Sequence, residues 1–368
     1  MKDLTKNIPQ GRLLSLDFFR GFTMFLLIGE FTELFGYLID PSLKGTFIYF
    51  IGEQLHHHPW NGLHFWDLVQ PSFMFIVGVA MVYSVANREK KGDSPQLIRK
   101  HAFIRSFLLL LFGWMLYCIV PGHLTLRFQN VLAQMSFTYI VAFFLMKKDY
   151  KIQIAVSFLV LIITEIVYRS FSVPGFDQPF VANHNFGTWL DLQYGGADLK
   201  EYWVSFNALP TTAHTIWGVL AGLLLRSDKS ATQKLKILAL VGITGVIVGY
   251  ALNPITPIIK RISTSSFVIV SGGWVFLFLA FSYWLIDIKK SQNWVIIFSI
   301  VGMNSLFIYL FAHVGGAEFI YDIIKPFSNG LFGWTGELGS NIIARMITWG
   351  GLWYLCFYLY KHKLFIKI

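Results

Sequence analysis

The feature that most constrains this chain is a series of ten long apolar runs separated by polar segments. A bilayer core is about 30 Å thick, and a helix needs roughly 20 apolar residues to cross it. We therefore expect an all-α, polytopic membrane bundle of about ten transmembrane helices. The runs cover residues 13–38, 66–86, 102–120, 129–146, 152–168, 206–225, 236–252, 264–286, 294–313 and 341–360. Glycines and a proline interrupt residues 314–332, where we expect a partly helical loop.

The composition excludes the common alternatives to a membrane protein. Of the 368 residues, 55% are hydrophobic and 14% are charged, whereas soluble domains carry about 25% charged residues. This composition is not that of a disordered chain, a coiled coil or an ordinary soluble enzyme. No internal repeat or linker is visible, so we expect one transmembrane domain over residues 1–368. Cys118 and Cys356 lie in apolar runs and indicate neither a disulfide framework nor a zinc site.

The basic residues indicate the orientation of the predicted helices. With the N-terminus inside, 20 of the 30 Lys and Arg residues fall in inner segments, 7 in outer segments and 3 within the runs. Cytoplasmic loops carry such an excess, so both termini are predicted to be cytoplasmic. This distribution explains the formal net charge of +10 without a nucleic-acid partner. No cleavable signal peptide is expected, because the first run lacks a small-residue cleavage site.

Charged side chains inside the apolar runs are candidates for function, because charge at membrane depth is costly. Asp17 and Arg20 are three residues apart and are expected to pair on one helix face. A structural ion pair is the alternative to substrate binding there. Glu30 and Glu33 have the same spacing, and we expect both on one face of the first helix, where either could lie near a reacting group.

Several other polar side chains leave packing and chemistry as open alternatives. Asp67 begins the second run, where an aspartate is either a helix cap or a catalytic group. Arg345, near the start of the last run, either binds an anion or neutralises an acidic neighbour. The remaining polar residues of interest in the runs are Asn130, Gln134, His214, Asn304 and His313.

Histidines gather in the outer segment 39–65, just before the second run. His56, His57 and His58 are consecutive, and His64 follows closely. A metal site is one interpretation, but adjacent residues do not easily face one ion and no cysteine completes a site. A solvated loop is the second interpretation. The third is a general base, a role that suits histidine because its pKa lies near neutral pH.

Lys260 and Arg261 lie in a predicted outer loop, where basic residues are disfavoured. They directly precede an expected helix start at residues 263–266. Positive charge and exposed N–H groups would therefore meet at one place, which suits an anion. Snorkelling of the two side chains beside the helix is the alternative.

Short motifs occur in order from about residue 12 to the C-terminus. They are RLLSLDFFRG at 12–21, WNGLHFWDLVQPSFMFIVG at 60–78, NP at 253–254 followed by TSSFV at 264–268, GMNS at 302–305, and the basic-aromatic end KLFIKI at 363–368. Together they resemble the motifs of the transmembrane acyltransferase family, which includes the heparan-alpha-glucosaminide N-acetyltransferases and shorter bacterial relatives.

The resemblance implies transfer of an acetyl group from cytoplasmic acetyl-CoA to an amine or hydroxyl of a sugar on the outer side. The family's catalytic histidine lies three residues before WNGL, which corresponds to His57. It would act as general base or as acetyl carrier, with Asp67 and Glu30 as further catalytic candidates. Glu30 or Phe31 occupies the region where the family has an asparagine late in the first helix.

The resemblance also assigns expected surroundings and binding groups. It implies a bacterial cytoplasmic membrane protein with acetyl-CoA and an amino sugar or glycan as partners, and it is compatible with a homodimer. From the spacing of the histidines themselves, no metal is expected. Buried amide and hydroxyl donors would stabilise the oxyanion, and the basic pair would bind an acidic acceptor or a phosphate of CoA. The binding candidates are Asn304, His313, Thr264, Ser265, Ser266, Lys260, Arg261, Arg20, Asp17 and Arg127.

Two other functions remain open. A transporter or flippase of a glycan precursor would also use a polytopic bundle with intramembrane carboxylates, although such transporters often show paired repeats that this sequence lacks. An O-acyltransferase of a cell-envelope glycan would apply the same chemistry to a hydroxyl. Release of free CoA from acetyl-CoA separates the transporter from the enzymes.

Overall fold

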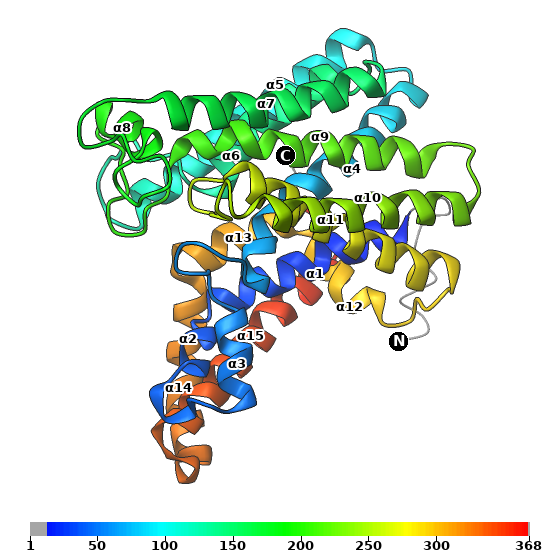
Figure 1. The fold of residues 1–368 in the computed structure, drawn as a ribbon. Helices are drawn as coiled ribbons and strands as arrows, with labels where there is room; N and C mark the ends of the chain where they lie inside the picture. The colour runs from blue at the N-terminus through cyan, green and yellow to red at the C-terminus, as the bar shows by residue number, and fades with distance from the viewer. Residues whose placement is uncertain (1–12, 367–368) are drawn as a thin grey trace. The chain divides into compact units, whose positions relative to one another are not determined.

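The computed structural model describes residues 13–366, which are helical apart from loops and one isolated β-bridge between Asn61 and Ile259 (Figure 1). The prediction of an all-α fold is confirmed. The basic residues Lys2, Lys6, Arg12 and Lys367, which were counted as cytoplasmic, lie outside the described residues.

The longer helices and the short helical turns alternate along the chain. The α-helices are α1 (Leu14–Glu30), α2 (Leu34–Leu38), α3 (Phe47–Gln54), α4 (Val69–Lys90), α5 (Pro95–Ile119), α6 (Val131–Leu145), α7 (Tyr150–Ser170), α8 (Phe186–Gln193), α9 (Ala208–Arg226), α10 (Ala231–Leu252), α11 (Ser265–Ser282), α12 (Val295–Met303), α13 (Ser305–Phe311), α14 (Ala317–Phe332) and α15 (Gly336–Lys361). The 3-10 and π-helical turns are η2 (Pro41–Leu43), η3 (Phe65–Leu68), η4 (Ser205–Asn207), η5 (Tyr283–Ile288), η6 (Ala312–Gly316) and η7 (Gly333–Thr335).

Seven helical segments within the described residues are long and apolar enough to cross a membrane. They are Phe65–Lys90, Pro95–Ile119, Tyr150–Ser170, Ser205–Arg226, Ala231–Leu252, Ser265–Ile288 and Ser305–Lys361. The apolar helix Val131–Leu145 is shorter. These segments identify a multi-pass membrane protein. The count of ten spans and the cytoplasmic position of both termini stay predictions.

The segment 314–332 is more helical than its glycines and proline indicate. The break is confined to the turn around Gly315, whose φ of 102° is readily adopted only by glycine. Helix α14 then continues to Phe332 with Pro326 in its interior. An internal proline removes one backbone hydrogen bond, but α14 packs along α15, and this packing stabilises the helix (Figure 1). The predicted loop at 314–332 is therefore wrong.

The described chain forms two compact units. The first contains residues 13–57, 64–69 and 282–366, and the second contains residues 58–63 and 70–281. The expectation of one functional domain over residues 1–368 stays a prediction.

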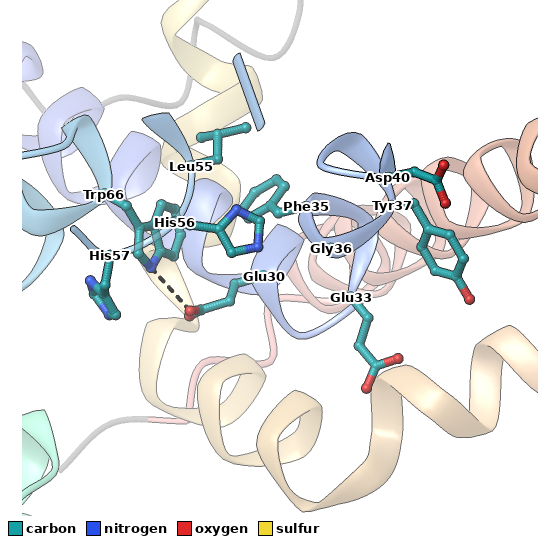
Figure 2. Close-up of a pocket in the computed structure, with 10 residues that line it drawn as sticks. All are labelled: Glu30, Glu33, Phe35, Gly36, Tyr37, Asp40, Leu55, His56, His57 and Trp66. Carbon is teal, nitrogen blue, oxygen red and sulfur yellow. Dashed lines mark hydrogen bonds between the residues drawn. The ribbon is translucent and has the colours of Figure 1, made fainter. Parts of the chain in front are cut away.

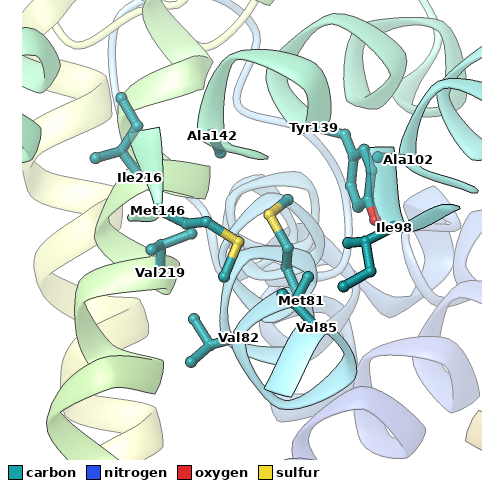
Figure 3. Packing of buried hydrophobic residues seen from close by; sticks show 10 residues of the cluster. All are labelled: Met81, Val82, Val85, Ile98, Ala102, Tyr139, Ala142, Met146, Ile216 and Val219. Carbon is teal, nitrogen blue, oxygen red and sulfur yellow. The ribbon is translucent and has the colours of Figure 1, made fainter. Parts of the chain in front are cut away.

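Small residues bring the helices of the second unit into close contact. Helix α9 packs against α6 and α7, and α5 packs against α6. A Cβ atom at Gly218 of α9 would lie 2.0 Å from the carbonyl oxygen of Phe75 in α4, so only glycine permits this approach. Beside it lies an apolar cluster in which Met81 and Met146 fill the space between helices (Figure 3).

The first unit is organised around the contact between α1 and α12. A Cβ atom at Gly21 would lie 2.0 Å from the carbonyl oxygen of Phe298, so the two backbones touch at this point. Phe18 packs edge to face on Trp294 and on Phe298, with ring centroids 4.8 and 5.4 Å apart. Helix α15 contacts α1, α12 and α2. These contacts hold α1 in place within the first unit.

The predicted orientation is tested by labelling single cysteines in a background that lacks Cys118 and Cys356. Lys44 and Lys229 are both exposed, which makes their positions accessible to a reagent. With an impermeant thiol reagent on intact cells, we expect labelling at position 44 and none at position 229 until the membrane is permeabilised. Labelling at 229 without labelling at 44 would invert the predicted topology.

Candidate active site

A pocket of about 600 Å³ lies beside the C-terminal end of α1 in the first unit (Figure 2). Pockets that bind small molecules commonly measure about 300–1,000 Å³. Among the described residues that line it, three are acidic and two are histidines, and none is a lysine or arginine. The lining residues are Glu30, Glu33, Phe35, Gly36, Tyr37, Asp40, Leu55, His56, His57 and Trp66.

A break in the first helix shapes one wall of this pocket. Helix α1 ends at Glu30, and Glu33 adopts a left-handed conformation with φ 56° and ψ 11° before α2 begins. The hydroxyl of Thr32 donates to the carbonyl oxygen of Gly29 at 2.6 Å and so competes with the helical hydrogen bonds. The expectation that Glu30 and Glu33 share one helix face is therefore wrong, although both line the pocket.

Asp67 links the candidate histidine to the start of η3. The Asp67 side chain is 1% exposed, and that of His57 is 27% exposed. Nδ1 of His57 lies 2.9 Å from Oδ1 of Asp67. The other carboxylate oxygen, Oδ2, accepts the backbone N–H of His64 at 2.8 Å. Asp67 thus caps η3 and orients His57 at the same time, so the two interpretations of this residue do not exclude each other.

The bond to Asp67 determines which nitrogen of His57 is basic. A carboxylate only accepts hydrogen bonds, so Nδ1 of His57 carries the proton and Nε2 carries the lone pair of the neutral ring. A buried carboxylate in this position also stabilises the imidazolium that forms when the ring is protonated. His57 is therefore equipped to accept a proton through Nε2.

The neighbouring histidines have structural bonds instead. Nδ1 of His56 donates to the carbonyl oxygen of Gly52 at 2.7 Å, at the end of α3. Nδ1 of His64 donates to the carbonyl oxygen of His56 at 3.0 Å. Both hydrogen bonds stabilise the turn that carries His57. His58 belongs to the second unit. Within residues 13–366, no group of three or more His, Cys, Asp and Glu residues could hold a metal ion.

The residue next to Asp67 positions the second acidic candidate. Trp66 is buried and donates its indole N–H to Oε1 of Glu30 at 3.0 Å, which Figure 2 marks with a dashed line. Phe35 packs edge to face on Trp66 at 5.2 Å. Consecutive residues of η3 therefore hold both Glu30 and His57, and both side chains line the same pocket.

A buried arginine contacts Glu33 of the pocket lining. The Arg345 side chain is 4% exposed. Its Nη2 lies 3.1 Å from a carboxylate oxygen of Glu33, and its Nη1 lies 2.6 Å from one of Glu318. The guanidinium carbon lies 3.3 Å from the centroid of the Tyr321 ring. Arg345 therefore neutralises acidic neighbours, which was one of its two predicted roles.

The other candidates of the first unit lie outside the pocket lining. Arg20 pairs with Asp17 at 3.6 Å, as the spacing predicts. Asn304 separates α12 from α13, and its side chain donates to the carbonyl of Leu364 and accepts from the N–H of Ile366, each at 3.0 Å. His313 lies in the π-helical turn η6, and its ring stacks on the ring of Tyr309 in α13. Roles of these groups in substrate binding stay predictions.

The basic pair of the second unit surrounds an aromatic ring. Lys260 and Arg261 lie over Trp203, at 5.4 and 5.1 Å from the ring centroid. Arg261 also pairs with the carboxylate of Glu201 at 2.9 Å. The Lys260 side chain is buried. An anion at this pair stays a prediction.

The predicted hydroxyl donors of the second unit are engaged locally. Thr264 and Ser266 both donate to the carbonyl oxygen of Pro257, at 2.7 and 3.0 Å. Ser265 donates to a carboxylate oxygen of Glu165 at 3.2 Å. These bonds fix the loop before α11. Their role toward an oxyanion stays a prediction.

The second unit also contains a polar centre that the sequence interpretation missed. Asp191 in α8 is fully buried and accepts from the hydroxyl of Tyr194 at 2.5 Å, and the hydroxyl of Ser205 also bonds to it. Burial and the bond to Asp191 raise the pKa of Tyr194. Asp198, which follows Asp191 closely in the sequence, forms an ion pair with Arg127 at 2.6 Å. The sequence feature that could have indicated this polar centre is Asp191, which stands between two leucines.

These observations define a multi-pass helical membrane protein in which a His–Asp pair faces an acidic pocket. No protein-family model matches the chain. The chain is similar to heparan-alpha-glucosaminide N-acetyltransferase of Mus musculus, at 31% identity over 142 residues, which are 37% of this chain and 19% of that protein. The Homo sapiens protein of the same name is 35% identical over 136 residues, which are 35% of this chain and 18% of that protein.

The chain matches only about a fifth of the length of these relatives. The identities support a distant relationship to them, and the relationship predicted from the sequence motifs is confirmed.

The double role of Asp67 predicts a difference between two substitutions. Asp67→Ala leaves the N–H of His64 and Nδ1 of His57 without their acceptor, and we expect a loss of about 2 kcal/mol or more in unfolding free energy. Asp67→Asn keeps one acceptor oxygen and should lose less.

Thermal unfolding in detergent measures both variants, with Glu53→Gln, an exposed residue of α3, as the matched control. Equal losses for the Ala and Asn variants would contradict the assigned role of the two carboxylate oxygens.

Proposed function

We propose that this chain is a membrane acetyltransferase that moves an acetyl group from acetyl-CoA to an amine or hydroxyl of a sugar. The observation that carries the proposal is the bond between His57 and the buried Asp67 at the wall of a pocket. The relatives' name, heparan-alpha-glucosaminide N-acetyltransferase, supports the same chemistry. The donor would come from the cytoplasm and the acceptor from the outer side of a bacterial cytoplasmic membrane.

In this proposal His57 performs the proton transfer. Nε2 removes a proton from the attacking amine or hydroxyl, whose N or O then bonds to the thioester carbonyl carbon of acetyl-CoA. The carbon–sulfur bond breaks, CoA leaves as the thiolate, and the proton held on Nε2 passes to that thiolate or to water. Asp67 holds the ring and stabilises the imidazolium. A second route, in which Nε2 itself takes the acetyl group before the acceptor arrives, uses the same geometry.

The charge of the pocket lining supports the acceptor as its occupant. Glu30, Glu33 and Asp40 line it, and no lysine or arginine is among its lining residues within 13–366. Phosphates of CoA would therefore be repelled, while a protonated amine would be attracted. Glu30 is the carboxylate that the indole of Trp66 fixes, and it would bind the acceptor's ammonium group. The ammonium group would lose one proton to water to give the amine, and His57 would take the second proton as the amine attacks. An amino sugar therefore suits the pocket better than a sugar that offers only hydroxyls.

Purified protein tests the activity directly. Incubation with acetyl-CoA and glucosamine should release free CoA and yield N-acetylglucosamine, which mass spectrometry identifies. A transporter or flippase would release no CoA. Acetylation of hydroxyls with amines left untouched would favour the O-acyltransferase alternative.

His57 and its neighbour provide a matched pair of variants. His57→Ala should lower the rate of acetyl transfer by about 10²- to 10⁴-fold, because it removes the general base. His56→Ala removes only the bond to the end of α3 and should retain most of the rate. Similar losses at both positions, with folded protein by thermal unfolding, would point to collapse of the turn and would contradict the assigned role of His57.

A further inference from the structure

The pocket extends well beyond the His57–Asp67 pair. In Figure 2, His57 and Glu30 lie on one side, whereas Glu33, Tyr37 and Asp40 lie on the other. The volume of about 600 Å³ is in the range of pockets for drug-sized ligands, which are larger than one sugar ring. An acceptor of one sugar, with its amine at His57, would leave the far side of the pocket empty.

The far side offers an aromatic residue and two carboxyl side chains. Tyr37 lines the pocket, where aromatic side chains are common in small-molecule sites, and the Arg345 guanidinium lies 5.9 Å from its ring centroid. Oδ1 of Asp40 accepts both the N–H and the hydroxyl of Ser42, at 2.9 and 2.6 Å, so Oδ2 remains for a ligand. These bonds lower the pKa of Asp40, which is therefore ionised at neutral pH.

Arg345 fixes the second carboxylate from behind. Its guanidinium contacts Glu33 and Glu318 while it stacks on Tyr321, and its side chain is almost fully buried. Because one guanidinium is shared between two carboxylates, the group keeps a net negative charge. Arg345 is not itself part of the lining, so an anionic ligand in the pocket would meet Glu33 and not the arginine.

We propose that Glu33, Tyr37 and Asp40 form a second acceptor subsite for a second amine-bearing sugar unit, and that Arg345 is a positioning residue that holds Glu33 in this subsite. The proposal rests on the acetyl-transfer function given above. A second ammonium group would be attracted by two carboxylates, whereas a unit with a carboxylate or sulfate would be repelled. The acceptor class is therefore an oligomer of glucosamine and not an acidic glycan.

Four acceptors test the subsite on the purified full-length protein. They are glucosamine, the β-1,4-linked disaccharide of glucosamine, the same disaccharide with its second unit N-acetylated, and glucosamine linked to a uronic acid. CoA release gives kcat/KM, and isothermal titration calorimetry gives binding without turnover. We expect the diamine disaccharide to exceed glucosamine by about two- to fivefold in both measurements, since ion pairs of exposed carboxylates contribute on this scale. The uronate disaccharide should rank last.

Variants assign the preference to the named residues. Asp40→Asn and Glu33→Gln should each reduce the ratio of diamine disaccharide to glucosamine, whereas Glu53→Gln on α3, which does not line the pocket, should leave the ratio unchanged. Arg345→Met should raise KM for the diamine disaccharide about two- to fivefold with little change in kcat, and Arg345→Lys should restore part of the loss. A fall in kcat equal for all acceptors would show that Arg345 has only a structural role.

Two outcomes separate failure of the subsite from failure of the proposed function. CoA release with equal kcat/KM for glucosamine and its disaccharide, or with a preference for the uronate, would overturn the subsite. Tighter binding of the diamine disaccharide, lost in Asp40→Asn, but without CoA release, would support the subsite and overturn acetyl transfer. Neither binding nor CoA release with any acceptor would overturn both.

Discussion

The candidate site depends on one buried carboxylate. Asp67 is withdrawn from solvent, and each of its oxygens has a separate partner, the backbone N–H of His64 and the ring of His57. Burial of an unpaired carboxylate would be very costly, so both bonds are required for the turn to form as it does. The same bonds that close the 3-10 turn η3 therefore also select the tautomer of the histidine that faces the pocket.

The sequence predicted the fold class well, because the length of the apolar runs and the scarcity of charge leave few alternatives to a helical membrane protein. It failed where a local contact overrides a helical pattern. The spacing of Glu30 and Glu33 fits one helix face, but the hydroxyl of Thr32 takes the carbonyl of Gly29 and the helix ends. Conversely, Pro326 suggests a loop, yet the contact between α14 and α15 sustains a helix through it.

The candidate site was predicted in part. The resemblance singled out His57 from four histidines, and the structure gives a physical distinction: His56 and His64 donate to backbone carbonyls, whereas His57 bonds to a buried carboxylate. Tyr37 and Asp40 could not be predicted, because they enter the pocket only through the break after α1. Likewise, no spacing in the sequence brings Glu33 to Arg345, which is 312 positions away.

The adjacency of Trp66 and Asp67 has a mechanical consequence. Both sit on the four-residue turn η3, so their bonds to Glu30 and His57 cannot change independently. In the proposed acetyl transfer, an acceptor that fits badly against Glu30 and shifts the indole would also move the carboxylate that orients the imidazole. A poor fit against Glu30 would thereby leave the ring of His57 poorly aligned for proton transfer. Discrimination between acceptors would then appear in turnover even where the acceptors bind equally tightly.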